Sequence, residues 1–180
     1  MATLTRGITL GTEAVGVKLC GVTPQDAVPL FQLIEANRDH LSRWGDNTSA
    51  KYPDFESVLA SIVRPANPAR RRFGIWWGRL LVGTINLTPL SQREAEIDYW
   101  VPEQYGGRGF ATAVTKRLVQ YAHNGLGYEY IAASVHCADQ AGELILRRAG
   151  FRRVSRSGAL LRFVWVESDR EVLRYATYHR

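Results

Sequence analysis

The stretch Gln104-Tyr105-Gly106-Gly107-Arg108-Gly109-Phe110-Ala111 joins a strand-like run, 97–101, to a helix-like run that continues to Ala122. Glycines at such a junction expose backbone N–H groups at the start of a helix, and a helix start carries a partial positive charge. Phosphate and pyrophosphate groups bind readily to such unpaired donors. The sequence therefore predicts a phosphorylated ligand at this junction.

Two other kinds of phosphate-binding loop fit this stretch poorly. A Walker-type loop ends in Gly-Lys-Ser/Thr, whereas Gly109 is followed here by Phe110 and Ala111. A dinucleotide-binding loop needs GxGxxG within repeated strand-helix units, and Thr112 stands where its third glycine should be. A glycine turn that binds nothing is the simplest alternative, and we rank it below a ligand-binding loop.

Outside the junction, the pattern of apolar residues predicts a chain of mixed α and β structure. Pro24 follows Thr23 at a first helical position and begins a helix that we expect to end before Gly45. The dipeptide Gly78-Arg79 predicts a hairpin turn. The helix after the glycines should bury the stripe formed by Phe110, Val114, Leu118 and Ala122. The other expected elements are strands 15–19, 73–77, 80–88, 94–101 and 128–136, helices 55–63, 110–122 and 139–149, and a terminal hairpin of 160–166 with 171–178 around Ser168-Asp169.

The bulk composition suits one folded domain spanning 1–180, with 46% apolar and 22% charged residues. The sequence has no apolar run long enough to cross a bilayer and no signal-peptide pattern, so we expect a cytoplasmic protein without a membrane partner. Cys20 and Cys137 suggest neither a disulfide framework nor a metal motif, so no metal is expected. The net charge of +6 is scattered along the chain, which favours a solvated basic surface over a nucleic-acid partner.

The glycine stretch resembles a family signature. Gln104 to Gly109 matches the Gln/Arg-x-x-Gly-x-Gly/Ala motif of the GNAT superfamily of acyl-CoA-dependent N-acetyltransferases. The order of elements and the stretch VHCADQAGELILRRAGF (135–151) resemble this family through most of the chain. Segment 35–44, the strand AEIDYWV (95–101) and the closing hairpin are similar to the RimJ/RimL-like branch, which acetylates N-terminal amines of ribosomal proteins and also contains enzymes acting on small amines.

The resemblance implies an α/β fold in which a twisted mixed sheet, flanked by helices, opens between strands 95–101 and 128–136. Acetyl-CoA, the implied cosubstrate, would lie in this opening. Its pantetheine arm would pair with the backbone like an extra strand, and its pyrophosphate would meet the N–H groups of residues 107–112, where a Cβ at position 107 or 109 would obstruct the approach or the turn. The cofactor-binding residues implied are Tyr99, Trp100, Val101, Gln104, Gly106, Gly107, Arg108, Gly109, Phe110, Ala111, Thr112 and Asp139.

Acetyl transfer to an amine needs a proton acceptor, because a typical alkyl amine is mostly protonated at pH 7. Side chains alternate along a strand, so Glu94, Glu96, Asp98 and Trp100 share one face. Carboxylates two residues apart on one face lie roughly 7 Å from each other, close enough for a water to bridge them. Glu96 stands where similar family members carry their glutamate base. Asp98, where the family usually has glycine, could bind the substrate ammonium, assist Glu96 or be a plain surface acid.

Two positions depart from the pattern of the RimJ/RimL-like branch. Its usual Asn-x-x-Ser is represented by Asp139 and Gly142, and a tyrosine used by other branches would fall at Leu146. Both hydroxyls proposed to protonate the departing thiolate are therefore missing. A thiolate can still leave partly unprotonated or take a proton from water, and Asp139 can cap the following helix as well as asparagine would.

The function that the resemblance implies is direct transfer of an acetyl group from acetyl-CoA to a primary amine within a ternary complex. The acceptor would be a protein N-terminal amine or a small-molecule amine, and Trp44 and Trp100 are expected to line its pocket. The alternative is a non-catalytic GNAT-like module that binds or senses acyl-CoA. A homodimer, common among relatives, is an expectation without its own signature in this sequence.

Overall fold

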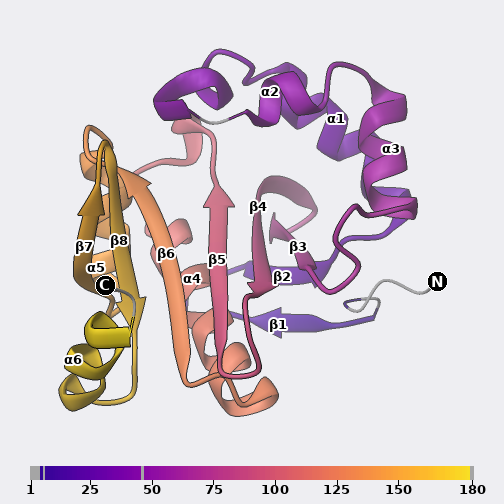
Figure 1. Ribbon diagram of the computed structural model, residues 1–180. Coiled ribbons are helices and arrows are strands. Elements are labelled where there is room, and N and C mark those ends of the chain that lie inside the picture. The colour runs from indigo at the N-terminus through magenta and orange to yellow at the C-terminus, as the bar shows by residue number, and fades with distance from the viewer. Residues whose placement is uncertain (1–4, 6, 46, 179–180) are drawn as a thin grey trace.

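One open sheet of eight strands organises the molecule (Figure 1). The computed structural model describes residue 5 and residues 7–45 and 47–178. The strand order is β1-β2-β3-β4-β5-β6-β8-β7, and neighbouring strands are antiparallel except β5 and β6, which are parallel. The strands are β1 (Thr9–Gly11), β2 (Val17–Gly21), β3 (Arg71–Trp77), β4 (Leu80–Pro89), β5 (Glu94–Trp100), β6 (Tyr130–His136), β7 (Arg152–Ser157) and β8 (Leu160–Trp165).

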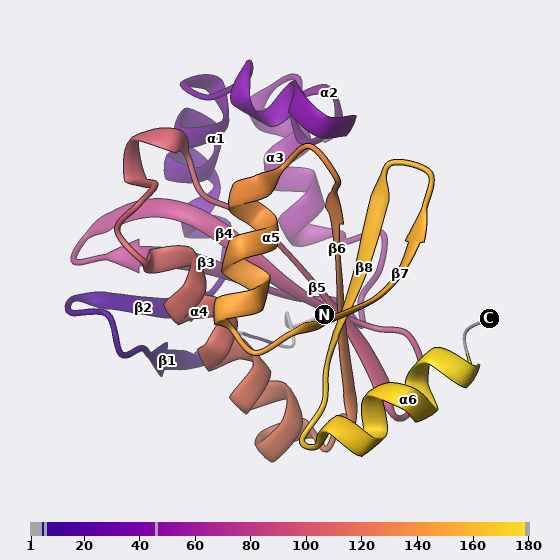
Figure 2. The ribbon, with the colours of Figure 1, turned by 90° about the vertical axis from the view of Figure 1, so that its left-hand side faces the viewer.

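Helices pack on both faces of this sheet (Figure 2). Successive residues of β5 show the two layers, because Tyr99 packs with the core beneath α4 whereas Trp100 packs with the core of α1 and α3. Among the described residues, no helix is long and apolar enough to cross a membrane. The helices are η1 (Pro24–Asp26), α1 (Ala27–Glu35), η2 (His40–Gly45), α2 (Thr48–Lys51), α3 (Phe55–Val63), η3 (Glu103–Tyr105), α4 (Phe110–Gln120), η4 (Tyr121–Gly125), α5 (Gln140–Arg148) and α6 (Asp169–Tyr178).

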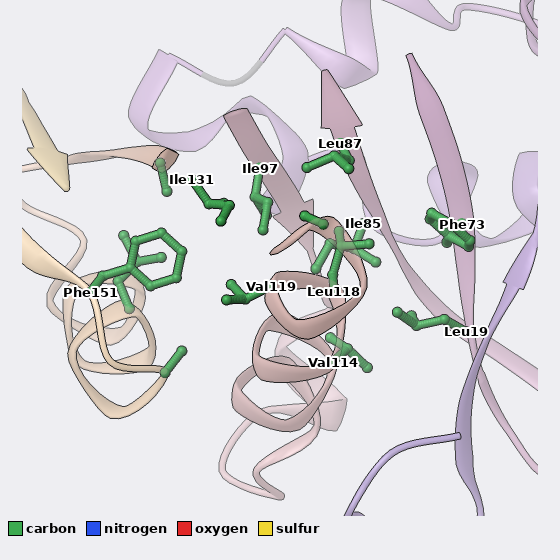
Figure 3. Close-up of a cluster of buried hydrophobic side chains, with 14 of the residues drawn as sticks. Leu19, Phe73, Ile85, Leu87, Ile97, Val114, Leu118, Val119, Ile131 and Phe151 are labelled. Atoms are coloured by element: carbon green, nitrogen blue, oxygen red, sulfur yellow. The ribbon is translucent and has the colours of Figure 1, made fainter. Parts of the chain in front are cut away.

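The larger core lies between the sheet and α4 (Figure 3). Val114 and Leu118 of α4 lie within it, together with Ile85 of β4 and Ile97 of β5, and all four are fully buried or nearly so. The apolar stripe predicted for this helix is confirmed, since Phe110, Val114, Leu118 and Ala122 are all buried. Burying a side chain of this size contributes roughly 1.5–3 kcal/mol. The packing therefore fixes the start of α4 beside the end of β5.

The smaller core lies between α1, α3 and the opposite face of the sheet. The predicted helix 55–63 is confirmed, and Asp54 caps it by accepting a hydrogen bond from the backbone N–H of Ser57 at 2.7 Å. Arg38 holds the segment between α1 and α3 by donating to the carbonyl oxygens of Ser49 (2.9 Å) and Tyr52 (3.1 Å). This clamp keeps the segment folded against α1.

The prediction of one helix from Pro24 to Gly45 was wrong. Helix α1 ends at Glu35, and the chain then turns into the short 3-10 helix η2. Asn37 explains the ending, because its side-chain amide donates to the carbonyl oxygen of Leu33 at 2.8 Å and its backbone N–H donates to Ile34 at 3.0 Å. Such local bonds compete with the regular helical ladder.

The predicted terminal hairpin of 160–166 with 171–178 was also wrong. Strand β8 pairs instead with β7, around a turn that contains Gly158 (φ 56°), and residues 169–178 form helix α6. Most side chains of β7 are exposed, so the strand lacks the alternating pattern that would have marked it. The hairpin of β3 and β4 around Gly78-Arg79 is confirmed, with Trp77 paired to Leu80.

Candidate active site

The sheet opens between β5 and β6. Their parallel register covers Glu94–Glu96 opposite Tyr130–Ala132 and ends there, whereas β5 stays paired with β4 as far as Trp100. Figure 1 shows the two strands diverging towards their C-terminal ends. Within the described residues, the β6-facing edge of β5 beyond Glu96 has no strand beside it. An extended ligand can pair with such an edge through main-chain hydrogen bonds, so the opening predicted from the sequence is present.

The glycine stretch leads from this edge into the start of α4. Gly107 (φ 71°) and Gly109 (φ 77°) both adopt the left-handed conformation, which favours glycine. A Cβ built at either position would meet no protein atom within 4 Å, so the space beside the loop is open. The requirement for glycine thus comes from the backbone conformation and leaves room for a ligand.

The loop also offers backbone donors. The first bond of the α4 ladder is donated by the N–H of Ala113 to the carbonyl oxygen of Gly109 at 3.0 Å. The N–H groups from Gly109 to Thr112 precede it and have no acceptor inside the helix. Unpaired donors at a helix start, together with its partial positive charge, are able to bind an anion.

Arg108 of the glycine loop stacks on a tryptophan of β3. Its guanidinium lies over the ring of Trp77, 5.3 Å from the ring centroid, and Trp77 also packs against Phe110 with centroids 5.5 Å apart. The contact ties the loop to the end of β3, and a stacked Arg–Trp pair of this kind contributes roughly 0.5–1 kcal/mol when exposed. In this arrangement Arg108 anchors the loop, while Gln104 and Gly106 are exposed on it.

Glu96 lies where the sheet begins to open. Its Oε1 atom contacts Nη1 of Arg162 and accepts a hydrogen bond of 3.4 Å from Oγ of Ser134. Arg162 also donates to Ser134 at 3.1 Å. The side chain of Glu96 is 32% exposed, so solvent or a substrate can reach it. A carboxylate held this way can accept a proton directly or through a water.

Asp98 shares the face of Glu96 but has different partners. Arg70 Nη2 donates to both of its carboxylate oxygens, at 2.7 and 2.9 Å, and Asn86 Nδ2 donates to Oδ1 at 2.7 Å. The sheet therefore brings the two predicted catalytic residues to one face, and each carboxylate faces its own arginine. A water bridge between them stays a prediction.

The remaining residues predicted on β5 divide between the two faces. Tyr99 and Val101 pack against the larger core, and burial, followed by the charge of Asp139, raises the pKa of the Tyr99 phenol. Trp100 packs against the smaller core, which leaves it on the Glu96 face. Trp44 belongs to η2, but its side chain lies outside the described part of the molecule.

Asp139 caps α5, as the sequence predicted. Its Oδ1 accepts a hydrogen bond from the N–H of Gly142 at 2.9 Å. A Cβ at Gly142 would approach Oδ2 of Asp139 to 2.4 Å and Cγ2 of Val135 to 2.7 Å, so a serine does not fit here without a shift. Leu146 is 1% exposed and belongs to the larger core. Neither position supplies a hydroxyl to the opening.

A polar cavity of about 320 Å³ lies between the end of α1 and η3. Arg43 of η2 borders it and lies 3.4 Å from Oε2 of Glu103. His40 also borders it, and its Nδ1 atom is buried without a hydrogen-bond partner among the described residues. The cavity thus presents charged and polar groups, and one of them, Glu103, directly precedes the glycine stretch in sequence. Its lining residues are Glu35, Ala36, Asn37, Arg38, Asp39, His40, Arg43 and Glu103.

The basic partners of the two carboxylates were not predicted from the sequence. Arg162 alternates with the buried Leu161 and Phe163 on β8, and this pattern signals only that Arg162 faces the other side of the sheet. Arg70 precedes β3 without any such pattern. Among the described residues there is no group of three or more His, Cys, Asp or Glu residues arranged to hold a metal ion.

Comparisons with known proteins place this geometry in a family. The family model described as "Acetyltransferase (GNAT) domain" matches residues 17–152. The chain is 29% identical over 145 residues to the "Putative ribosomal N-acetyltransferase YdaF" of Bacillus subtilis (strain 168), which covers 77% of this chain and 78% of that protein.

Two solved structures share the fold. The ribosomal-protein-S5-alanine acetyltransferase from Vibrio fischeri superposes with a TM-score of 0.79 at 15% identity, covering 90% of this chain and 98% of that one. Mycobacterium smegmatis RimJ, solved in complex with CoA-disulfide, gives a TM-score of 0.74 at 22% identity, covering 94% and 95%. These similarities concern the arrangement of strands and helices.

Proposed function

The chain belongs to the GNAT acetyltransferase family and is an acyltransferase; from this premise we propose that it transfers an acetyl group from acetyl-CoA directly to a primary amine. The observation that carries the proposal is the position of Glu96, the last residue of β5 that pairs with β6. The open edge of the same strand leads from Glu96 to the glycine loop. A thioester substrate held along that edge, with its phosphates at the loop, would bring its reacting end towards Glu96.

The proposed reaction is a single displacement in a ternary complex. The neutral amine nitrogen attacks the thioester carbonyl carbon, a C–N bond forms, the C–S bond breaks and CoA leaves as a thiolate. Glu96 takes the proton that the amine loses, directly or through a water. Arg162 and Ser134 both contact Oε1 of Glu96, so we propose that Oε2 is the atom that accepts the proton.

The other residues of the site have a smaller part in the proposed reaction than Glu96. Gly142 and Leu146 offer no acid to the thiolate, so it leaves unprotonated or takes a proton from water. The carboxylate of Asp98 already accepts bonds from Arg70 and Asn86, and we assign it to orienting the acceptor ammonium. Much of the rate would then come from holding two substrates together, which is worth several kcal/mol in well-oriented reactions.

The acceptor that we propose to test first is the N-terminal amine of a protein. Support comes from the names of the similar proteins, which are a ribosomal N-acetyltransferase and a ribosomal-protein-S5-alanine acetyltransferase. The polar cavity lined by α1, η2 and Glu103 could receive the peptide that follows such an amine. Small-molecule amines are the second class.

The test combines binding and transfer. We would titrate the purified protein with acetyl-CoA by calorimetry, and then detect acetyl transfer by mass spectrometry with a panel of peptides beginning with alanine or serine and of small amines. In Glu96→Gln we expect kcat to fall by about 100-fold or more, because the proton acceptor is lost, with acetyl-CoA affinity within about 2-fold of wild type.

Glu129→Gln is the matched control, since Glu129 pairs with Arg93 at the surface before β6 and should leave both quantities unchanged. Retained turnover in Glu96→Gln would remove this residue from the mechanism. Binding without transfer to any acceptor would favour the acyl-CoA-binding module, and no binding would overturn the assignment of the glycine loop.

A further inference from the structure

A chain of polar contacts connects the C-terminal helix to Glu96. Tyr175 of α6 donates its phenolic O–H to Oε1 of Glu94 at 2.5 Å. Nη2 of Arg162 lies 3.4 Å from the same oxygen, and Nη1 of Arg162 contacts Glu96. We propose that Tyr175 and Glu94 are positioning residues that set how firmly Arg162 holds the Glu96 carboxylate, and through it how readily Glu96 accepts a proton. The catalytic consequence rests on the proposed function of Glu96 as base.

The two glutamates share one guanidinium because they lie two residues apart on the same face of β5. The side chain of Glu94 is only 9% exposed, and Tyr175 is 2% exposed. A buried carboxylate without hydrogen-bond donors is costly in free energy, so Glu94 needs hydrogen bonds from its neighbours. The phenol of Tyr175 donates one of them, and Glu94 therefore depends less on the hydrogen bond from Arg162.

The donors in this chain keep their protons over the whole working range of pH. Burial, together with the hydrogen bond to Glu94, raises the pKa of Tyr175 to about 12, so the phenol remains protonated and donates. Burial alone would lower the pKa of Arg162, but the hydrogen bond that its Nη2 donates to the Tyr175 hydroxyl at 3.5 Å and the charges of Glu96 and Glu94 raise it overall. Neither donor therefore changes charge between pH 4 and pH 9, and the hydrogen bonds that the two residues donate persist across this range.

Other charged groups near Glu96 belong to separate contacts. On β5 itself, Asp98 is paired with Arg70, which approaches from the segment before β3. On α6, Glu171 accepts a hydrogen bond of 2.8 Å from Tyr130 and pairs with Arg174. From β4 the residue opposite Glu96 is the uncharged Thr88, and from β6 the contact is Ser134. Within the part of the chain that the structure describes, Arg162 thus connects α6 to Glu96.

The test measures the pH midpoint at which the Glu96 carboxyl titrates, by NMR of the labelled glutamate side-chain carboxyl carbons, with the signal assigned from Glu96→Gln. Tyr175→Phe should raise the midpoint by about half a pH unit, because Glu94 then draws Arg162 away from Glu96. Glu94→Gln should lower the Glu96 midpoint by about the same amount. Arg162 then pairs with the carboxylate of Glu96 alone, and the negative charge of Glu94 is gone.

Tyr130→Phe is the matched control. It removes another phenol-to-carboxylate bond between the sheet and α6, the 2.8 Å bond to Glu171, and keeps the Tyr130 ring that packs against Tyr175 with centroids 5.4 Å apart. We expect the Glu96 midpoint to stay unchanged in this variant. The double variant Glu94→Gln with Tyr175→Phe should match Glu94→Gln alone, because the phenol has lost the carboxylate on which it acts.

Shifts in the same direction for Tyr175→Phe and Glu94→Gln, or an equal shift in Tyr130→Phe, would overturn the proposal and leave α6 a purely structural role. The NMR result does not depend on finding an acceptor, so it stands even if no transfer is detected. Where transfer is measured, the acidic limb of kcat should move with the midpoint. If Tyr175→Phe and Glu94→Gln shift the Glu96 midpoint in opposite directions but leave the acidic limb of kcat unchanged, Tyr175 and Glu94 do position Arg162. Glu96 would then have no part in catalysis.

Discussion

The glycine loop and the carboxylate face are two halves of one candidate site that are built in different ways. The loop consists of consecutive residues, and its binding groups are backbone N–H donors from Gly109 to Thr112. The carboxylate face is assembled from β5, β6, β8 and the segment before β3, and its working groups are the side chains of Glu96, Asp98 and their two arginines. The first half is local in sequence and the second is not.

This difference has consequences for how each half can fail. Backbone donors carry no ionisable group and depend on conformation, so the loop is sensitive to any residue that cannot adopt positive φ. Side-chain contacts depend on partners far apart in the chain, so the carboxylate face is sensitive to single charge changes and to pH. Substitutions that act on one half only should therefore separate cofactor binding from turnover.

Among substitutions other than Glu96→Gln, the largest effect is expected at the loop. Gly109→Glu forces a side chain into the left-handed conformation and places a negative charge at the anion site, so we expect the Kd for acetyl-CoA to rise about 100-fold, or about 2.7 kcal/mol. Isothermal titration calorimetry measures it. Gly158→Glu, which has the same left-handed conformation (φ 56°) and open space at the β7–β8 turn, is the control and should bind normally. Equal losses in both variants would mean that strain alone explains the effect.

The next largest effect is expected from the arginines of the carboxylate face. Arg162→Met should lower kcat about 30-fold, because the Glu96 carboxylate loses the contact that holds it in position, while acetyl-CoA affinity stays within about 2-fold. Arg70→Met removes the corresponding partner of Asp98 and should lower kcat by less than about 3-fold if Asp98 only orients the acceptor. Steady-state kinetics on the two variants tests the comparison, and the reverse order would make Asp98 the more important carboxylate.

A smaller effect, on stability, is expected at Gly142. Gly142→Ser introduces a side chain 2.4 Å from Asp139 Oδ2 and 2.7 Å from Val135 Cγ2, so we expect a loss of about 1.5 kcal/mol in the free energy of unfolding. Restoring the branch's usual serine should therefore not raise kcat. Urea denaturation measures the loss, with Gly11→Ser as control because its Cβ meets open space. An unchanged stability with faster turnover would show that the missing hydroxyl had limited the reaction.

The smallest effect is a pH dependence of stability at Glu171 of α6, which pairs outside both halves of the site. The hydrogen bond from Tyr130, followed by that from Arg174, lowers the pKa of Glu171 below 4.5. Because the folded pKa is depressed, this carboxylate stabilises the protein above pH 4.5, and the contribution is lost as the pH falls through the folded pKa. Urea unfolding from pH 6 to pH 3 should show wild type and Glu171→Gln converging at the acid end. A difference that persists there would contradict this assignment.

Much of the fold could be predicted because its signals are local. The apolar stripe of residues 110–122, the turn at Gly78-Arg79 and the helix over 55–63 each follow from residues that are close together in the sequence. The two errors arose where local pattern was weak. The exposed β7 has no alternation, and Asn37 ended α1 by hydrogen bonds that apolar spacing does not reveal.

The amino-acid sequence by itself determined the glycine loop, because positive φ and free N–H groups follow from residue type and from the start of a helix. It also determined that Glu96 and Asp98 share a face, because strands alternate. Only the tertiary structure decided which charges those carboxylates meet. Arg162 lies 66 residues from Glu96 and Arg70 lies 28 residues from Asp98, and such pairs are set by strand order and register, which depend on packing across the whole sheet.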